Sequence, residues 1–184
     1  MGLTHPLCAR RQGVDGVISV LRYEGVIRSV LKHIKYRFVY SAFSDLFNSL
    51  DPAMLTQVAR FRATWSDAFL QPVPLHPTRL RSRGFNQALY IAEFFSKLLR
   101  YEIVSLVEKS ASTPPQAQMG TRYERHTNVK DVFNVYMTKQ KELEGKNIII
   151  VDDVVTSGNT VSSLARELKK YRAGKVFVFS LARG

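Results

Sequence analysis

The sequence predicts an α/β protein built on a doubly wound, mainly parallel sheet. The segment 147–151 contains the continuous apolar run 148–151, residues 175–182 are mostly apolar, and a helical pattern lies between the two segments. The apolar positions of that helix are Val161, Leu164, Ala165 and Leu168. A continuous apolar run is typical of a strand buried on both faces of a parallel sheet. Strand, helix and strand within about 35 residues form a βαβ unit, and such units build doubly wound sheets.

The amino-terminal part of the chain predicts one strand and three helices. Residues 13–23 alternate in places between apolar and small or polar residues, which suits a strand. A helical spacing of apolar residues follows at Val26, Ile27, Val30, Leu31 and Ile34. Two further helices are expected over residues 40–50 and 52–60. Asp51 would cap the second of these helices, and Pro52 would occupy its first position.

The middle of the chain predicts two short strands around a long helix. Residues 69–73 are apolar and run into a proline-containing loop, which indicates a strand that ends at an exposed turn. Residues 86–99 have apolar residues on one helical face, and residues 102–107 predict another strand. Residues 110–130 are polar and basic, so they predict a long loop or lid, a kind of segment that usually has a function or is disordered.

Composition restricts the class of protein. The chain has 184 residues and a net charge of +12, which suits one domain that attracts phosphate groups on small ligands or nucleic acid. No apolar run approaches the roughly 18 residues of a membrane helix. Residues 1–12 lack the long apolar core of a secretory signal and carry Arg10 and Arg11. We therefore expect a cytoplasmic protein without membrane contact.

Two acidic residues follow the 147–151 strand and lead into a short loop rich in hydroxyl groups. Asp152 and Asp153 stand at the carboxyl end of the strand, where ligands bind in open α/β sheets. The loop consists of Thr156, Ser157, Gly158, Asn159 and Thr160. It opens directly into a helix, so backbone N–H groups and the helix dipole converge on one spot. Because Gly158 also permits close approach of a ligand, the loop predicts a phosphate monoester site.

Two carboxylates beside a phosphate site require an explanation, because they repel the anion. A ribose 5-phosphate supplies one: its phosphate would sit in the loop, and its hydroxyl groups would donate to the acids. Adjacent strand residues face opposite sides. Both acids would reach the ligand only if the strand already turns at Asp153; otherwise one acid supports the other. An ordinary strand end followed by a capped helix is the alternative. The lysine of a nucleotide-binding loop and the G-x-G-x-x-G of a dinucleotide site are both missing.

Residues 148–160 resemble the phosphoribosyl pyrophosphate (PRPP) binding motif of type I phosphoribosyltransferases. Ser157 and Asn159 depart from the usual pattern but keep its hydrogen-bonding groups. A second stretch, Arg83-Gly84-Phe85-Asn86-Gln87, resembles the ComF (competence protein F and GntX-like) family. The likeness extends over nearly the whole chain. It implies the type I phosphoribosyltransferase fold, a doubly wound, mainly parallel sheet with a flexible lid or hood.

The resemblance also implies where the pyrophosphate of PRPP would bind. The loop would be residues 73–76, which include Pro74, Leu75 and His76, with Arg79 and Arg83 nearby. Forked guanidinium donors suit diphosphate oxygens. The alternative for these arginines is a solvated basic loop. Asn86 and Gln87 open the next helix, where capping alone would explain them.

By the same resemblance, residues 116–128 would form a flexible lid over the ligand. Its candidate ligand-binding residues are Gln116, Arg125 and Asn128. A lid excludes water, which matters because an oxocarbenium-like ribosyl centre hydrolyses readily. A mobile surface segment without that role is the alternative.

Relatives in the ComF family often begin with a cysteine-rich zinc module. Here residues 1–12 contain only His5 and Cys8 as ligand types, and structural zinc requires four ligands. We therefore expect residues 1–12 to be a remnant of a zinc knuckle or a flexible lead, with no zinc in this chain and an inert thiol at Cys8. A lost module, a chain that starts late and a metal shared by two chains are the alternatives. Residues 13–184 would form the phosphoribosyltransferase-like domain.

Two functions follow from the resemblance. The first is a phosphoribosyltransferase that binds PRPP with Mg²⁺ and passes ribose 5-phosphate to a nitrogen nucleophile. Asp152 and Asp153 would be its catalytic residues, with no direct protein ligand to the metal expected. PRPP or another small molecule containing ribose 5-phosphate would be its partner, and a homodimer is compatible with this function.

The second function is that of a competence or DNA-uptake factor that binds single-stranded DNA and uses the PRPP site for binding or regulation only. The charge of +12 and the interleaved basic and aromatic residues over 32–40 favour it. Core packing is the alternative, and aromatic residues of this kind are more often core residues.

Overall fold

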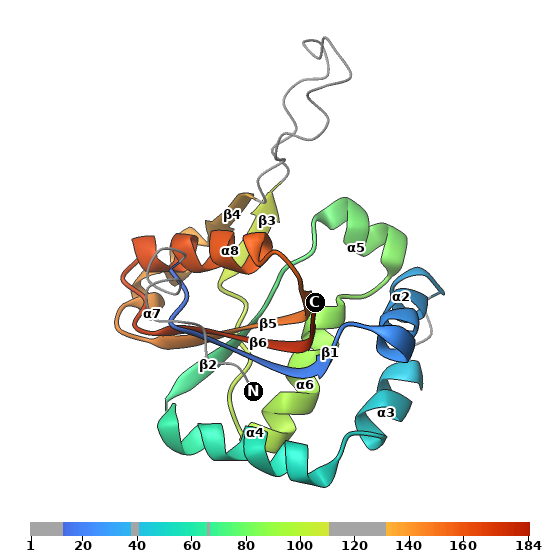
Figure 1. The fold of residues 1–184 in the computed structure, drawn as a ribbon. Coiled ribbons are helices and arrows are strands. Elements are labelled where there is room, and N and C mark those ends of the chain that lie inside the picture. Colours follow the sequence, from blue (N-terminus) through green and yellow to red (C-terminus); the bar gives the residue numbers. More distant parts are fainter. Residues whose placement is uncertain (1–12, 38–40, 66, 111–131) are drawn as a thin grey trace.

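The computed structural model describes residues 13–37, 41–65, 67–110 and 132–184. Four strands form the central sheet in the order β1, β6, β5, β2 (Figure 1). Their bounds are β1 Gly16–Arg22, β2 Ala68–Pro72, β5 Asn147–Val155 and β6 Val176–Arg183. All three neighbouring pairs are parallel. The predicted parallel sheet is confirmed.

Both faces of this sheet are buried. Along β5, Ile148 and Ile150 belong to one hydrophobic cluster, whereas Ile149 and Val151 belong to the other. Side chains of a strand alternate between the two faces, so a strand covered on both sides needs apolar residues at every position. Burial on both faces therefore explains why residues 148–151 are all apolar.

Helices cover both faces, which makes the sheet doubly wound (Figure 1). One face carries α2 Gly25–Arg37, α3 Ser41–Asn48, α4 Pro52–Thr64 and α6 Gln87–Leu99. The other face carries α8 Asn159–Lys170, the antiparallel hairpin of β3 Val107–Ser110 and β4 Val132–Val135, and α7 Gln140–Leu143 after the 3-10 turn η3 Met137–Lys139. The short α5 Pro77–Arg83 lies between β2 and α6 in the sequence and has no buried residue.

The predicted strand over 13–23 and the helices over 40–50, 52–60 and 86–99 are confirmed. Asp51 caps α4 as expected, because its Oδ1 accepts a hydrogen bond from the Ala53 backbone N–H at 2.8 Å. Helix α4 continues to Thr64, four residues beyond the predicted end. None of the described helices combines the length and apolarity needed to span a membrane.

Two strand predictions need correction. Residues 102–107 do not form one strand: Ile103 makes a single parallel bridge to Leu70, and β3 begins only at Val107 in a different sheet. Strand β5 does not end at residue 151, because its ladder with β6 continues through Asp152 to Val155. In both cases hydrogen bonds to strands distant in the sequence decide where the strand begins or ends. The local pattern of residues does not show these bonds.

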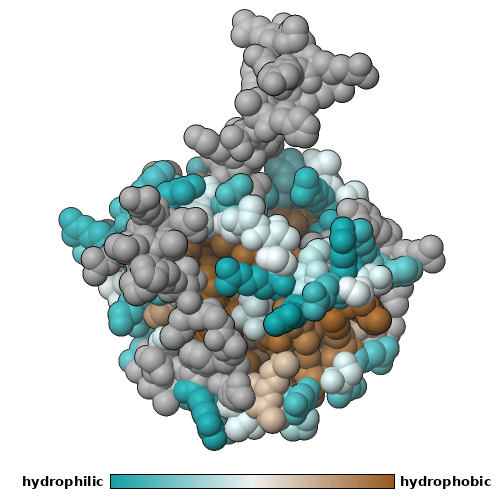
Figure 2. Space-filling view, in the orientation of Figure 1, coloured by the Kyte–Doolittle hydropathy of each residue, from teal (hydrophilic) through white to brown (hydrophobic). Residues whose placement is uncertain are grey.

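The basic segment after residue 76 is also not a loop throughout. Pro77 opens α5, and the arginines of this segment lie on that helix. A helix with no buried residue has no apolar periodicity to reveal it. Figure 2 shows hydrophilic side chains over α5, at the upper right of the view.

Candidate functional site

Two adjoining pockets lie at the carboxyl edge of the sheet. The larger one, here called the ligand pocket, has a volume of about 200 Å³ and lies between the β2–α5 loop, the start of α6, β3 and β5. The smaller one, the loop pocket, has a volume of about 50 Å³ and is lined by residues 154–161 together with Asp152. Asp152, Val154 and Thr160 line both pockets. The two pockets therefore form one continuous candidate site.

The loop pocket contains all five residues of the predicted phosphate loop. They are Thr156, Ser157, Gly158, Asn159 and Thr160. Gly158 stands at the N-cap of α8 with a φ of 75°, a left-handed conformation that glycine adopts without strain. No side chain caps this helix, and its first turn carries no acidic residue. The helix dipole and the first backbone N–H groups therefore favour an anion here.

Asp152 and Asp153 both line the ligand pocket. The Oδ1 of Asp152 accepts a hydrogen bond from the Asp153 backbone N–H at 2.9 Å, and the Oδ1 of Asp153 accepts one from the Val154 N–H at 2.8 Å. Each carboxylate thus turns back onto its own chain. The strand continues to Val155, so a turn at Asp153, one of the two alternatives, is absent, yet both acids line the pocket. Asp152 is partly exposed, whereas Asp153 is buried.

The predicted pyrophosphate loop lies at the opposite wall. Val73, Pro74 and Leu75 line the ligand pocket, but His76 does not. The His76 Nδ1 instead accepts a hydrogen bond from the Thr78 backbone N–H at 3.2 Å and caps α5. A side chain used for capping is turned toward its own helix, which explains why His76 is the exception.

Arg79 and Arg83 line the ligand pocket from α5. Three cationic side chains, these two and Lys109 of β3, therefore border a pocket with two carboxylates. This combination of cationic side chains and carboxylates suits a ligand that carries both phosphate and hydroxyl groups. The cations bind phosphate, and the carboxylates accept hydrogen bonds from hydroxyl groups.

Five further lining residues were not predicted as ligand-binding: Asn86, Gln87, Ala88, Lys109 and Val154. Asn86 caps α6 as expected, with Oδ1 accepting from the Ala88 N–H at 3.0 Å, and its Nδ2 donates to the Val73 carbonyl at 3.0 Å. The second bond joins the helix to the pocket wall. The stretch from Arg83 to Gln87, which carries the ComF resemblance, was the sequence feature that could have indicated Gln87 as a pocket residue. Nothing in the local sequence indicates Lys109, because β3 itself was not predicted.

Several predicted residues lie outside the described residues. These are the lid residues Gln116, Arg125 and Asn128, the candidate metal ligands His5 and Cys8, and residues 38–40 of the aromatic and basic segment. The lid, the absence of zinc and the single-stranded DNA contact therefore stay predictions.

Comparisons with known proteins show which family the chain resembles. A family model described as the phosphoribosyl transferase domain matches residues 86–183, more than half of the chain. Competence protein ComFC of Bacillus subtilis is 28% identical over 97% of this chain and 77% of its own length. The DNA utilization protein YhgH of Escherichia coli K12 is 29% identical over 91% of this chain and 71% of its own.

Two further likenesses cover less of the chain. Competence protein F of Haemophilus influenzae is 30% identical over 61% of this chain and 48% of its own length. The crystal structure of a purine phosphoribosyltransferase from Pyrococcus horikoshii covers 71% of this chain and 79% of its own, with 16% identity and a TM-score of 0.43. The predicted resemblance to ComF proteins is confirmed by the curated relatives, and the chain belongs to the phosphoribosyl transferase domain family with its type I α/β fold.

Proposed function

We propose that this chain binds PRPP and transfers its ribose 5-phosphate to a nitrogen nucleophile. One observation carries the proposal: the loop pocket and the ligand pocket adjoin at Asp152 and Thr160, and Arg79 and Arg83 stand on the far wall of the ligand pocket. The order of groups along PRPP is 5-phosphate, ribose hydroxyls, then pyrophosphate. The candidate site has the matching order: the phosphate loop, then the two carboxylates, then the arginines.

Each part of the ligand then has its residues. The 156–160 loop would bind the 5-phosphate through backbone N–H groups and hydroxyls. Asp152 and Asp153 would accept hydrogen bonds from the ribose hydroxyls. Residues 73–75, Arg79 and Arg83 would bind the pyrophosphate, and His76 would act indirectly by capping α5.

Mg²⁺ fits this donor set. Among the described residues, no group of three or more His, Cys, Asp or Glu side chains that could hold a metal occurs. Two adjacent carboxylates without a third acid suit Mg²⁺, which keeps several waters and takes further ligands from substrate phosphates. Asp152 and Asp153 would hold the ion through such waters. When bound, Mg²⁺ would supply charge neutralisation of the pyrophosphate.

The transfer itself needs positioning and charge stabilisation. The bond from ribose C1 to the pyrophosphate oxygen breaks, and its electron pair leaves with that oxygen. The lone pair of the acceptor nitrogen forms the new C1–N bond, and the nitrogen loses its proton to solvent. Arg79 and Arg83 would stabilise the negative charge on the departing pyrophosphate, and the carboxylates would stabilise positive charge at the ribose ring.

Titration calorimetry with PRPP and Mg²⁺ tests the ligand assignment. We expect wild type to bind PRPP and Asp153→Asn to bind it about tenfold more weakly, because an amide is a poorer acceptor for the ribose hydroxyls. Asp45→Asn, an exposed site on α3, is the matched control and should bind as wild type does. Equal affinity of wild type and Asp153→Asn, or no binding by either, would remove the assignment. Release of pyrophosphate in the presence of candidate bases then tests the transfer.

A second candidate function is the binding of single-stranded DNA. The names of the relatives, "Competence protein" and "DNA utilization protein", together with the net charge of +12, favour it. Binding through phosphates releases counterions, so the affinity should fall steeply as salt rises. An affinity for a single-stranded oligonucleotide that is independent of salt would contradict this second function.

A further inference from the structure

Gln87 is held in place at the wall of the ligand pocket. It is the first residue of α6, is only 3% exposed and lines the ligand pocket. The Arg83 Nη1 donates a hydrogen bond to its Oε1 at 2.8 Å. Since a guanidinium group can only donate, this bond fixes which end of the Gln87 amide is the oxygen.

The other end of that amide has no partner. The Gln87 Nε2 is buried and makes no hydrogen bond, and it is the one buried side-chain nitrogen or oxygen in this condition across the described parts of the chain. Buried polar groups are almost always paired, so an exception calls for an explanation. Gln71 shows the usual situation: its Nε2 donates to the Pro72 carbonyl at 2.7 Å, and its Oε1 accepts from the Leu106 N–H at 2.7 Å.

We propose that Gln87 is a ligand-binding residue whose Nε2 donates to an oxygen of the pyrophosphate group of PRPP. The proposal rests on the function proposed above and adds a residue to its site. In the free protein the Nε2 lacks an acceptor, and the ligand supplies one. The Oε1 meanwhile keeps Arg83 oriented toward the same group, so Gln87 acts on the ligand both directly and through Arg83.

The position of Gln87 selects the pyrophosphate half of the ligand. Its hydrogen-bonding partner Arg83 is on α5, and the neighbouring Asn86 bonds to the carbonyl of Val73 at the start of the pyrophosphate loop. The ribose half of the pocket is bounded by Asp152, Asp153 and Thr160 instead. Loss of the Gln87 amide should therefore weaken PRPP and pyrophosphate but leave ribose 5-phosphate unaffected.

Two substitutions separate the two functions of the side chain. Gln87→Met keeps the length but removes both the donor and the acceptor. Gln87→Glu keeps an acceptor for Arg83 but removes the donor and adds a charge that repels phosphate. Gln71→Met is the matched control, because it makes the same change at a buried glutamine whose groups are all paired.

Calorimetry with three probes, PRPP with Mg²⁺, inorganic pyrophosphate with Mg²⁺, and ribose 5-phosphate, measures binding, and thermal unfolding of the ligand-free variants measures stability. Gln87→Met should lose about tenfold in affinity for the first two probes, and Gln87→Glu should lose more. Ribose 5-phosphate should bind all variants alike. The ligand-free Tm should stay equal or rise in both Gln87 variants and fall in Gln71→Met.

The possible results separate this inference from the proposed function. If wild type binds PRPP and both Gln87 variants bind it equally well, the inference is wrong and the proposed function stands. If Gln87→Met lowers the Tm as Gln71→Met does and weakens all three probes alike, Gln87 is structural and the inference is again wrong. If wild type binds none of the probes, the proposed function and this inference fall together.

Discussion

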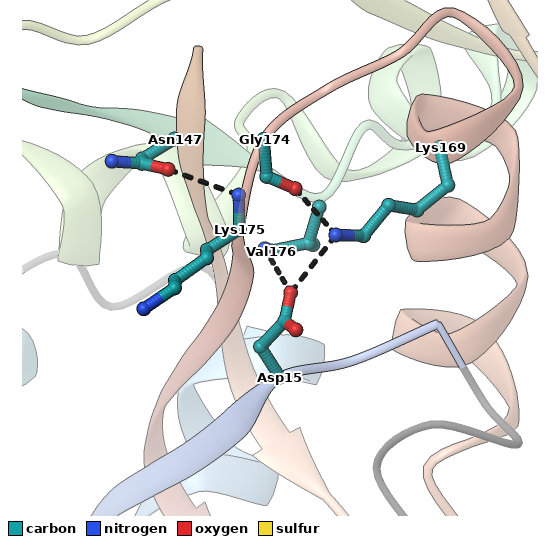
Figure 3. Close-up of polar contacts among 6 residues, drawn as sticks. All are labelled: Asp15, Asn147, Lys169, Gly174, Lys175 and Val176. Carbon is teal, nitrogen blue, oxygen red and sulfur yellow. Dashed lines mark hydrogen bonds and ion pairs between the residues drawn. The ribbon is translucent and has the colours of Figure 1, made fainter. Parts of the chain in front are cut away.

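The two edges of the central sheet use the same kinds of polar side chain for different purposes. At the amino edge, Asp15 Oδ2 accepts hydrogen bonds from the Val176 backbone N–H at 2.6 Å and from Lys169 Nζ at 3.0 Å (Figure 3). Lys169 also donates to the Gly174 carbonyl, and Asn147 Oδ1 accepts from the Lys175 N–H at 2.9 Å. These bonds join β1, β5, β6 and the end of α8, so the amino edge holds the fold together.

The carboxyl edge has a different organisation. Asp152 and Asp153 each accept a hydrogen bond from the backbone N–H of the next residue of their own strand, and the buried Nε2 of Gln87 donates to none of the described residues. Substitution at the amino edge should therefore cost folding stability, whereas substitution at the carboxyl edge should cost ligand affinity. Three substitutions test this difference, each with a control of the same type.

Gly174→Ala should have the largest effect. A Cβ atom at this position would lie 2.8 Å from both the Asn147 Oδ1 and the Gly145 carbonyl oxygen, and 3.2 Å from the Lys146 carbonyl oxygen. Backbone at the amino edge must move to admit it, at a cost of about 3 kcal/mol in the free energy of unfolding. Denaturant unfolding measures the loss. Gly145→Ala is the control, because its φ of 70° is strained but the space around it is open, so about 1 kcal/mol is expected. Equal losses in the two variants would contradict the steric argument.

Asp15→Ala should have the second largest effect. It should lower the free energy of unfolding by about 2 kcal/mol, because it leaves the buried N–H of Val176 without an acceptor. The ion pair alone contributes less than about 1 kcal/mol, since the Lys169 side chain is 34% exposed. Lys169→Met in the same unfolding experiment keeps the bond between Asp15 and the Val176 N–H and removes both contacts of Lys169, the ion pair and the bond to the Gly174 carbonyl. A loss for Lys169→Met as large as that for Asp15→Ala would mean that the contacts of Lys169, and not the Val176 amide, hold this edge.

Gly158→Ala should have the smallest effect on stability, about 1 kcal/mol for a side chain at a φ of 75°, and should lower ribose 5-phosphate affinity about tenfold. The affinity falls because the backbone N–H groups of the loop pocket shift away from the phosphate. Gly25→Ala has a comparable strain at a φ of 50° with open space around it, so it should lose stability without losing affinity. Unchanged ribose 5-phosphate binding by Gly158→Ala would place the phosphate elsewhere.

The sequence predicts the parts of the fold whose residues are buried on a regular face. Strand β6 and helix α8 have continuous or periodic apolar residues, so local pattern and tertiary packing agree. The end of β5 was missed because aspartates are poor strand formers, and the pairing with β6 that runs from Asp152 to Val155 keeps them in the ladder. Strand β3 was missed because its partner β4 lies more than 20 residues away in the sequence.

The candidate site likewise has some features that the local sequence predicts and others that depend on the three-dimensional structure. The order of residues in the 152–160 segment was enough to place the acids and the loop together, because all of them stand at one strand-to-helix junction. The capping of α5 by His76 was not predicted, because this helix has no apolar face to reveal it. The unpaired Nε2 of Gln87 depends on three-dimensional surroundings, and no pattern of residue types reports it.

The order of strands also has a consequence for how this chain folds as it is synthesised. Strand β1 pairs only with β6 within the described sheet, so Gly16 meets Phe177 across about 160 residues of chain. The apolar side chains of β1, such as Ile18 and Val20, stay without their strand partner until residues near 183 leave the ribosome. Contacts of such long range are slow to form, and an unpaired apolar strand is prone to aggregation. Chaperone dependence and refolding yield are therefore expected to respond to changes in β6 more than to changes in β1 itself.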